Sequence, residues 1–268
     1  MNYLLLPAPD SVLPPEGQAL SSNQAYHGAV IRERAQVDHV INILGAKAGD
    51  RLKVAQRHGN LGSALIDNIT AEAIYLSDIQ LSLAPPAKLG LTVILALPRP
   101  KVLRRLVMDM TALGVNHIIL LNSYRSQKSY WQSPMLARLN EFVDEGLQQA
   151  GDTVAPQISL KKRFKPFVEE ELASYLPNRW PIGLGSGGIV AHPYAAASLG
   201  GYLDELKGGS ENQSLPSLIC IGAEGGWIDY EIDLFQAHGC HPVSIGRRIL
   251  RTEAAVNALL GHWLLANH

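Results

Sequence analysis

The strongest constraint in this sequence is an alternation, from residue 91 onward, of continuous apolar runs with segments of helical apolar spacing. The run LTVILAL (91–97) is apolar almost throughout, as expected of a strand that is covered on both faces. In the next segment, Pro100 suits a first helical turn, apolar residues recur every three or four positions, and Gly114 suits a helix end. A second buried run is HIILLNS (117–123), and strand–helix pairs follow at 156–160 with 166–176, 188–192 with 194–206, 217–222 with 228–238, and 242–246 with 252–266. The alternation predicts an α/β domain with a mainly parallel sheet.

Residues 1–85 have a different texture, in which short β-like runs are separated by turn residues. The runs are YLLLP, VINIL, RLKVAQ, SALIDNI and AIYLS. Many short strands with intervening turns predict a small β-rich domain, either a barrel or a sandwich. The stretch LSLAPPAKLG (81–90), with its Pro-Pro pair, is the predicted linker. We therefore expect two domains, 1–82 and 83–268.

Length and composition restrict the class of protein. The 268 residues can form two modest cores, and 47% hydrophobic with 18% charged residues is a globular composition. The net charge of −1 provides no global attraction to nucleic acid, so RNA binding would need a local basic patch. The two cysteines give no disulfide framework and fit a reducing compartment. The N-terminus does not resemble a signal peptide, and no apolar stretch approaches the roughly 20 residues of a membrane span, so we expect a soluble, cytoplasmic protein.

Two motif matches are weak. GLGSGG (183–188) fits the spacing of a dinucleotide-binding loop, but its glycines precede a predicted strand, whereas that loop must follow one. A surface loop is therefore the expected structure. HGCH (238–241) gathers His238, Cys240 and His241, but a helix end followed by a turn and a strand explains the stretch without a metal ion. We expect no metal site.

Basic residues form local clusters in a domain that is otherwise near neutrality. Lys101, Arg104 and Arg105 fall on the helix face opposite the apolar stripe, with Arg99 just before them. A second cluster, Lys161, Lys162, Arg163 and Lys165, surrounds Phe164. Each cluster alone could be an ordinary solvated face, and with two in one domain a phosphate-binding surface becomes an equal alternative. The predicted RNA-binding residues are Arg99, Lys101, Arg104, Arg105, Lys161, Lys162, Arg163, Lys165 and Arg247.

Two loops at predicted strand ends concentrate charged residues and glycines. IGAEGGWIDYEI (221–232) puts a carboxylate and two glycines between a strand and a helix. SIGRRILRTEAAV (244–256) puts three arginines after a strand that ends at Gly246, and Thr252 can cap the helix that follows. Each could be a plain connection. However, α/β folds bind ligands at the carboxyl ends of their strands, which favours a functional interpretation.

Together, ICIGAEGGWIDYEI and PVSIGRRILRTEAAV resemble the two C-terminal signatures of the RsmE-type 16S rRNA uracil-N3 methyltransferases, a family in the SPOUT class of S-adenosylmethionine-dependent RNA methyltransferases. The family versions read approximately IGPEGG-F and LG-RILR-ETA. The stretch HVINILGAKAGDRLKV is a weaker match to the small PUA-like β-barrel of the family.

The resemblance implies a trefoil-knotted α/β domain, a homodimer, S-adenosylmethionine as cofactor, and rRNA of the small ribosomal subunit as partner. The cofactor would sit among three loops near the knot. The glycines would let the backbone approach it without a Cβ in the way. The implied cofactor-binding residues are Ala191, His192, Pro193, Ile221, Gly222, Glu224, Gly225, Gly226, Ile245, Gly246, Arg248, Ile249, Leu250 and Arg251.

Methyl transfer to N3 of uridine requires loss of the N3 proton before or during attack. A cation near the uracil carbonyls would favour the anion, and Arg251 is the first candidate. Glu253 or Glu224 could accept the proton, or either could hold its loop together, so the base stays unassigned.

The sequence departs from the family pattern at several positions. Ala223 replaces the proline of IGPEGG and Ala254 the threonine of ETA. A lysine and a glutamate of a K-x-x-ELG segment are replaced by Asp109 and Ala112. Asp152 and Gly45 stand where the family commonly has arginines. Because several of the lost groups are charged, the departures bear more on the substrate than on the reaction type.

Three functions therefore compete. The first is an S-adenosylmethionine-dependent methyltransferase acting on N3 of a uridine in 16S rRNA, or on another RNA. The second is a non-catalytic RNA-binding or assembly factor on the same fold, which would bind RNA without the cofactor. The third is an oxidoreductase that uses the glycines at 183–188, and it fails on motif context.

Overall fold

A computed structural model describes residues 2–7, 28–176, 187–208 and 215–266. The chain divides into two compact units. The first contains Met1–Ala87 and Asp144–Ala155, and the second contains Lys88–Val143 and Pro156–His268. Within the described ranges, no helix combines the length and the apolarity that a membrane crossing requires.

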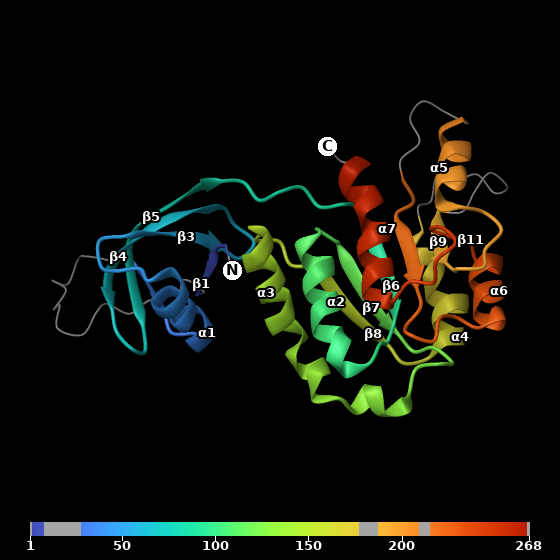
Figure 1. The fold of residues 1–268 in the computed structure, drawn as a ribbon, viewed down its shortest axis with the longest axis horizontal. Helices are drawn as coiled ribbons and strands as arrows, with labels where there is room; N and C mark the ends of the chain where they lie inside the picture. Colours follow the sequence, from blue (N-terminus) through green and yellow to red (C-terminus); the bar gives the residue numbers. More distant parts are fainter. Residues whose placement is uncertain (1, 8–27, 177–186, 209–214, 267–268) are drawn as a thin grey trace. The chain divides into compact units, whose positions relative to one another are not determined.

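The first unit is built on a curled five-stranded sheet (Figure 1). Its strands are β1 (Leu4–Leu6), β2 (Ala29–Ile31), β3 (Arg51–Gln56), β4 (Leu61–Ile69) and β5 (Ile74–Leu83), in the order β1-β3-β4-β5-β2. The two edge strands β1 and β2 also contact each other, so the sheet comes close to closing on itself. Its core includes Leu4, Val40, Val54, Ile66 and Leu76. The predicted barrel-like β domain is thus present.

One predicted strand in this unit is wrong. The run VINIL forms part of a helical segment, in which α1 (Arg34–Asp38) continues into η2 (His39–Leu44). Val40 is buried, whereas Ile43 and Leu44 are 72% and 51% exposed. The apolar run therefore does not mark a buried strand. Gly45, at φ +60°, ends the helix in the left-handed conformation that glycine adopts easily.

A distant segment completes the first unit. Helix α3 (Leu139–Ala150) ends within it, and the carbonyl of Gln148 accepts hydrogen bonds from the main-chain N–H groups of Asn2 and Tyr3 at 2.9 and 3.1 Å. The Thr153 hydroxyl donates to the carbonyl of Gly59 at 2.7 Å. The sequence indicated no such long-range association.

The second unit contains a six-stranded sheet in which every pairing is parallel. Its strands are β6 (Thr92–Ala96), β7 (His117–Leu121), β8 (Gln157–Lys161), β9 (Gly188–Ala191), β10 (Leu218–Ile221) and β11 (Cys240–Val243), in the order β11-β9-β10-β6-β7-β8. Strands β6, β7, β9 and β10 lie within runs that the sequence predicted, and β8 extends one residue past its run at 156–160. The prediction for β11 was displaced, because the strand begins at Cys240 and ends at Val243 rather than spanning 242–246. Since all run in one direction, their carboxyl ends meet at a single edge.

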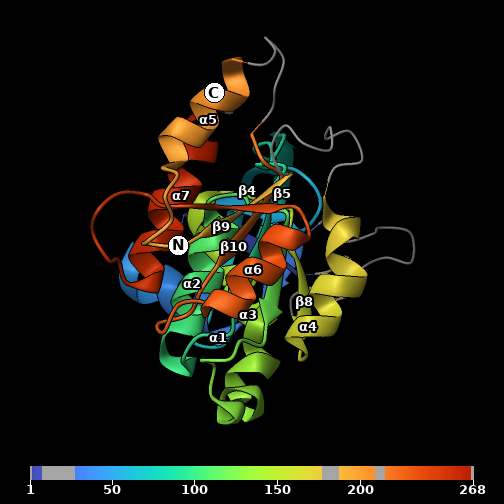
Figure 2. The same cartoon turned by 90° about the vertical axis from the view of Figure 1, so that its right-hand side faces the viewer.

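Helices cover both faces of this sheet, as Figure 2 shows in a nearly edge-on view. Helices α2 (Pro100–Ala112) and α7 (Thr252–Ala266) lie on one side. The other side carries α6 (Asp229–Ala237) and a helical stretch formed by α4 (Phe164–Pro166), η5 (Phe167–Glu171) and η6 (Leu172–Tyr175). Further helices are η3 (Lys128–Gln132), η4 (Pro134–Arg138) and α5 (Leu199–Gly208). The predicted parallel α/β architecture is confirmed.

The amphipathic helices explain how the layers hold together. In α2, the apolar stripe buries Leu103, Leu106, Val107 and Met110, each at 1% exposure or less. A buried side chain of this size contributes roughly 1.5–3 kcal/mol. Helix α7 is anchored at its far end, where the Trp263 indole N–H donates to the carbonyl of Pro216 at 2.8 Å. These contacts fix the start of α7 beside the carboxyl edge of the sheet.

Candidate functional site

A cavity of about 260 Å³ opens at the carboxyl ends of β9, β10 and β11. The three strands are in register, with Ala191 beside Ile221 on one side and Val243 on the other, so the loops that follow them emerge together. Three segments, 191–194, 221–227 and 243–252, supply most of the lining. This is the position at which open parallel sheets bind ligands.

The cavity brings together nearly all of the predicted cofactor-binding residues. Those in its lining are Ala191, His192, Pro193, Ile221, Gly222, Glu224, Gly225, Gly226, Ile245, Gly246, Arg248, Ile249 and Leu250. Arg251 is exposed and is not part of the lining. Three loops that are distant in sequence therefore form one concave surface.

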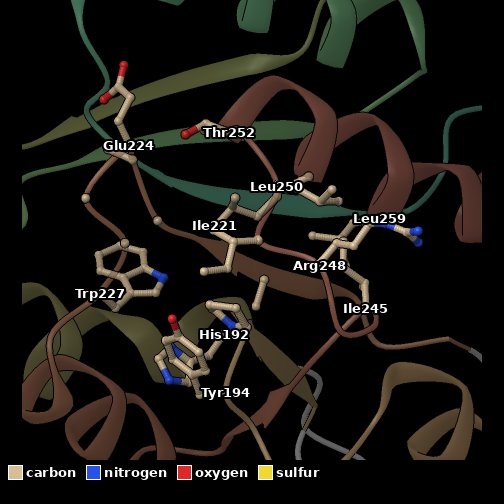
Figure 3. A pocket seen from close by; sticks show the side chains of 18 of the residues that line it. His192, Tyr194, Ile221, Glu224, Trp227, Ile245, Arg248, Leu250, Thr252 and Leu259 are labelled. Carbon is tan, nitrogen blue, oxygen red and sulfur yellow. The ribbon is translucent and has the colours of Figure 1, made fainter.

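The lining is mainly apolar, with its polar groups at the margins (Figure 3). Ile221 lies near the centre, with Ile245, Leu250 and Leu259 on one side and Trp227, His192 and Tyr194 on the other. The carboxylate of Glu224 points away from Ile221 and Trp227. An apolar slot with accessible main chain suits a flat heterocycle.

Sequence reasoning missed several residues of the lining. They are Arg125, Tyr194, Trp227, Val243, Thr252, Ala255 and Leu259, together with Ala223, which the sequence marked only as a departure. Tyr194 and Trp227 directly follow predicted loops and could have been included by position. Arg125 comes from the loop after β7, two strands away from β10, and nothing local in the sequence indicated that it would reach the site.

The glycines are required mainly by the folding of their own loop. A Cβ at Gly222 would lie 2.8 Å from the Cα of Gly226, and one at Gly225 would lie 2.9 Å from the Cδ of Arg125. Gly226, at φ +68°, has open space around its missing side chain. Gly246, which also lines the cavity, has open space as well. The prediction that glycine keeps a Cβ away from a ligand can thus apply to Gly226 and Gly246, whereas the packing of the loop itself requires glycine at Gly222 and Gly225.

Glu224 ties its loop to the start of α2. Its carboxylate accepts a hydrogen bond from the main-chain N–H of Arg99 at 3.2 Å and lies 3.5 Å from the Arg99 Nε. The two contacts join the loop after β10 to the loop after β6. Of the two roles that the sequence left open, this geometry favours loop support over proton transfer.

The loop after β7 is held to the same region by two further contacts. The Arg125 guanidinium donates to the carbonyl of Gly225. The carboxylate of Glu231, which is 1% exposed, accepts from the main-chain N–H groups of Tyr124 at 2.7 Å and Ile228 at 3.0 Å. Burial raises the pKa of Glu231, although these two hydrogen bonds partly oppose the effect. Glu231 therefore caps α6 and fixes the β7 loop at the same time.

Two ring side chains of the lining differ in burial, since Trp227 is buried and His192 is half-buried. The Trp227 indole packs between the cavity and the rings of Phe164 and Phe235, and its N–H has no hydrogen-bond partner among the described residues. The His192 ring meets Tyr194 edge-on at 5.6 Å between centroids. Burial lowers the pKa of His192, with Asp229 acting in the opposite direction.

The remaining predicted catalytic residue, Glu253, lies in the first turn of α7. Its carboxylate faces Arg105 on α2, with 3.8 Å between charged atoms, and its side chain is 21% exposed. The ion pair links the two helices on this face of the sheet. Arg251, just before α7, projects into solvent.

The predicted RNA-binding residues follow three different strands and share the carboxyl edge of the sheet. Arg99, Lys101, Arg104 and Arg105 follow β6; Lys161, Lys162, Arg163 and Lys165 come at the end of β8; and Arg247 follows β11. Lys161 and Lys165 pair with Glu171 and Glu169 at 2.5 and 3.6 Å. The two clusters are thus parts of one edge, although acidic neighbours partly neutralise the β8 group.

The two weak motifs have structural explanations where they are described. His238 ends α6 and bonds the carbonyl of Leu234 at 2.9 Å, whereas His241 stacks on Tyr202. Cys240 is buried beside Cys220, and burial raises the pKa of the Cys220 thiol. Among the described residues, no group of three or more potential metal ligands converges. Residues 183–186 of GLGSGG lie outside the described ranges, and Gly188 opens β9.

Several departures from the family pattern have structural roles. Asp152 is 2% exposed, and its carboxylate accepts from the N–H groups of Thr153 and Val154 at 2.6 and 2.9 Å. Asp109 accepts from the Asn257 side chain at 3.2 Å, which joins α2 to α7. Nothing in the structure explains Ala112 or Ala254.

Comparison with known proteins identifies the family of the part of the chain that carries this cavity. A family model described as "RNA methyltransferase domain" matches residues 85–264, which include the whole parallel sheet. The Ribosomal RNA small subunit methyltransferase E of Treponema pallidum (strain Nichols) is 28% identical over 222 residues, covering 82% of this chain and 79% of that protein. The protein of the same name in Synechocystis sp. (strain ATCC 27184 / PCC 6803 / Kazusa) is 27% identical over 272 residues, covering 97% of this chain and 78% of that protein.

A solved structure extends the similarity to the fold of both units. The crystal structure of a Ribosomal RNA small subunit methyltransferase E from Neisseria gonorrhoeae bound to S-adenosyl methionine aligns with a TM-score of 0.65 at 19% identity, covering 99% of this chain and 98% of that one. At this identity the similarity concerns the fold. Because the family model spans about two thirds of the sequence, including every loop of the cavity, the chain belongs to the RNA methyltransferase domain family.

Proposed function

We propose that this protein is an S-adenosylmethionine-dependent methyltransferase that acts on N3 of a uridine in 16S rRNA of the small ribosomal subunit. The observation that carries the proposal is the cavity in which the segments 221–227 and 243–252 meet. These are the segments with the family signatures, and relatives over most of the chain are named as small-subunit rRNA methyltransferases.

The residues of the cavity fit the cofactor. Ile221, Ile245 and Leu250 provide apolar surface for an adenine, and the turn at Gly226 leaves space beside the main chain. The unpartnered N–H of Trp227 is a buried donor that a polar ligand atom would satisfy. When bound, S-adenosylmethionine supplies an electrophilic methyl group on a sulfonium.

The chain's own residues would position the uridine and stabilise its anion. Arg251 is exposed at the cavity's edge and can bring a cation to the uracil carbonyls. Glu253 is a candidate for receiving the N3 proton. Glu224, already bonded to Arg99, would hold the cofactor loop in shape. Positioning of this kind supplies much of the rate in a displacement reaction.

The proposal has an architectural part. The second unit would contain the trefoil knot of the SPOUT class and form a homodimer with active sites near the subunit interface, and the protein would work in the cytoplasm. With the domain boundary at residues 82 and 83, the N-terminal barrel would grip RNA by shape and backbone. The family signatures support this part, and an experimental chain trace without threading near residues 244–251 would contradict the knot.

Cofactor binding can be tested with a matched pair of substitutions on α7. Ala255 lines the cavity, whereas its neighbour Ala254 is exposed and does not. Ala255→Leu adds a side chain in the binding space and should weaken S-adenosylmethionine binding at least 10-fold in calorimetry. Ala254→Leu should keep the wild-type dissociation constant. Equal affinities for both variants, or no binding by the wild type, would contradict the proposed site.

Methyl transfer itself is tested with isotopically labelled cofactor. The purified protein should transfer label to small-subunit rRNA or to the assembled subunit, and nucleoside analysis should identify 3-methyluridine. RNA binding without any transfer would instead indicate a non-catalytic factor.

A further inference from the structure

The exposed aromatic side chains of this protein have an uneven distribution. Among the described residues, the large aromatic side chains classed as exposed are Tyr124, Tyr194 and Tyr230, at 80%, 74% and 51%. All three belong to the second unit, and all three follow strands of the parallel sheet at its carboxyl edge. Exposed aromatic rings that gather at one edge are typical of a binding surface.

Specific contacts fix Tyr124 and Tyr194 at this edge, and Tyr230 is placed there by the first turn of α6. The main-chain N–H of Tyr124 donates to Glu231 at 2.7 Å, and Tyr230 precedes Glu231 in the first turn of α6, so both flank the same buried carboxylate. Tyr194 lines the cavity and meets the ring of His192. The backbones are therefore anchored while the rings project into solvent.

Basic residues flank the tyrosines along the carboxyl edge of the sheet. Following the strand order, Arg247 and Arg248 come after β11, Tyr194 after β9 and Tyr230 after β10. Arg99 and its neighbours come after β6, Tyr124 after β7, and Lys162 with Arg163 after β8. Six strands spaced roughly 4.8 Å apart make an edge on the order of 24 Å long.

Rings interleaved with cations are the chemistry that binds single-stranded nucleic acid, in which bases stack on aromatic faces and phosphates meet Lys and Arg. The N3 atom of a paired uridine lies within the base pair, so a target of the proposed reaction must be unpaired. A strand entering this cavity would bring its unpaired neighbours over the flanking rings.

We propose that the carboxyl edge of the sheet is a binding track for single-stranded RNA, in which Tyr124, Tyr194 and Tyr230 stack on unpaired bases beside the target nucleotide. The proposal rests on the proposed function for the identity of the strand. The acidic groups nearby do not block the track, because Glu224 pairs with Arg99 and Glu231 is buried. Asp229 is exposed beside Tyr230, so this position suits a base better than a phosphate.

Tyr124 and Tyr230 give the cleanest test, since neither lines the cavity. Tyr124→Ala and Tyr230→Ala should each raise the KM for RNA by roughly 10-fold, a typical loss for one stacked base. Tyr124→Phe and Tyr230→Phe keep the ring and should retain most of the affinity. The dissociation constant for S-adenosylmethionine should be the same in all four variants and the wild type.

Binding of a fluorescent single-stranded rRNA fragment, with a duplex of the same sequence as competitor, separates this proposal from the proposed function. If the wild type binds the single strand but transfers no methyl group, the track stands and the proposed function fails. If the wild type methylates RNA while the alanine variants keep wild-type KM and binding, the track is wrong. A loss of dimerisation in the alanine variants with unchanged RNA binding would also overturn it, because the rings would then serve a protein contact.

Discussion

Gly222 and Gly226 belong to one turn, yet a side chain at each would be resisted for a different reason. At Gly222 a Cβ would meet main-chain atoms of Gly226 at 2.8 and 3.0 Å, so the turn itself must move. At Gly226 there is open space, so the only cost of alanine is that of adopting the left-handed backbone conformation, about 1–2 kcal/mol. We expect Gly222→Ala to reduce both thermal stability and cofactor affinity more than Gly226→Ala, measured by calorimetry. Equal effects, or a milder Gly222→Ala, would contradict the described turn.

Arg251 lies outside the cavity lining but next to it in the chain, so its substitution tests the chemical step separately from cofactor binding. Arg251→Ala should keep the dissociation constant for S-adenosylmethionine while methyl transfer falls at least 100-fold, because a cation that favours the uridine anion acts mainly in the transition state. Single-turnover rates measured with saturating cofactor and RNA test this. Unchanged turnover would remove Arg251 from the mechanism.

The site residues that sequence reasoning found and missed differ in one physical respect. His192, Ile221 and Gly246 were found because each lies at the carboxyl end of a predicted strand, in the three segments that the family resemblance implies bind the cofactor. Arg125 was missed because its contact with Gly225 joins positions a hundred residues apart. Local spacing identifies strand ends, but it does not reveal which neighbouring loop folds across them.

Among the structural elements, α6 and the β7 loop depend on the single carboxylate of Glu231. Glutamine at this position has only one side-chain oxygen acceptor, so the N–H of either Tyr124 or Ile228 would lose its partner, at a cost of about 1–3 kcal/mol. Glu231→Gln should therefore lower the free energy of unfolding at pH 7, as measured by denaturant titration.

The pH dependence of this variant has a defined sign. Burial raises the folded-state pKa of Glu231 above its ordinary value of 4.5, so the folded protein takes up this proton before the unfolded chain does. The stability gained from this proton uptake is fully present below pH 4.5 and is lost as the pH rises through the folded-state pKa of Glu231. The free energy of unfolding of Glu231→Gln should therefore fall further below that of the wild type as the pH is lowered from 7 to 4.5. A deficit that shrinks on acidification would show that the carboxylate is not held in a desolvated site.

Element prediction succeeded where two signals coincided. Strands β6, β9 and β10 combine apolar runs with a predicted helix in the following segment. Helix α2 also carries the predicted start residue Pro100 and is followed by the stop residue Gly114, and α7 begins at its predicted cap Thr252. VINIL had an apolar run alone, and its helical structure depends on Gly45 and on contacts within the first unit. Helix α5 begins at Leu199, later than its predicted start at 194, because residues 192–198 form the cavity loop and its continuation.

At the scale of the whole molecule, the sequence predicted a β-rich N-terminal domain and an α/β domain after it. It did not predict which residues belong to each unit. Residues 144–155 belong to the first unit in part through main-chain hydrogen bonds to residues 2, 3 and 58. Backbone groups are the same in every residue, so their pairing leaves no trace in side-chain patterns.

The proposed homodimer is a further prediction at this scale. Multi-angle light scattering of the purified protein should give twice the chain mass of 29.1 kDa at micromolar concentration. A strict monomer across that range would count against the proposed SPOUT architecture, in which active sites lie near the subunit interface.

The central claim is that this chain methylates N3 of a uridine in small-subunit rRNA. Its most direct test is to map modified nucleosides in the 16S rRNA of a deletion strain and of the same strain complemented with the wild-type gene. We predict that 3-methyluridine is absent at one position after deletion and returns on complementation. An rRNA modification profile that does not change between the two strains would contradict the claim.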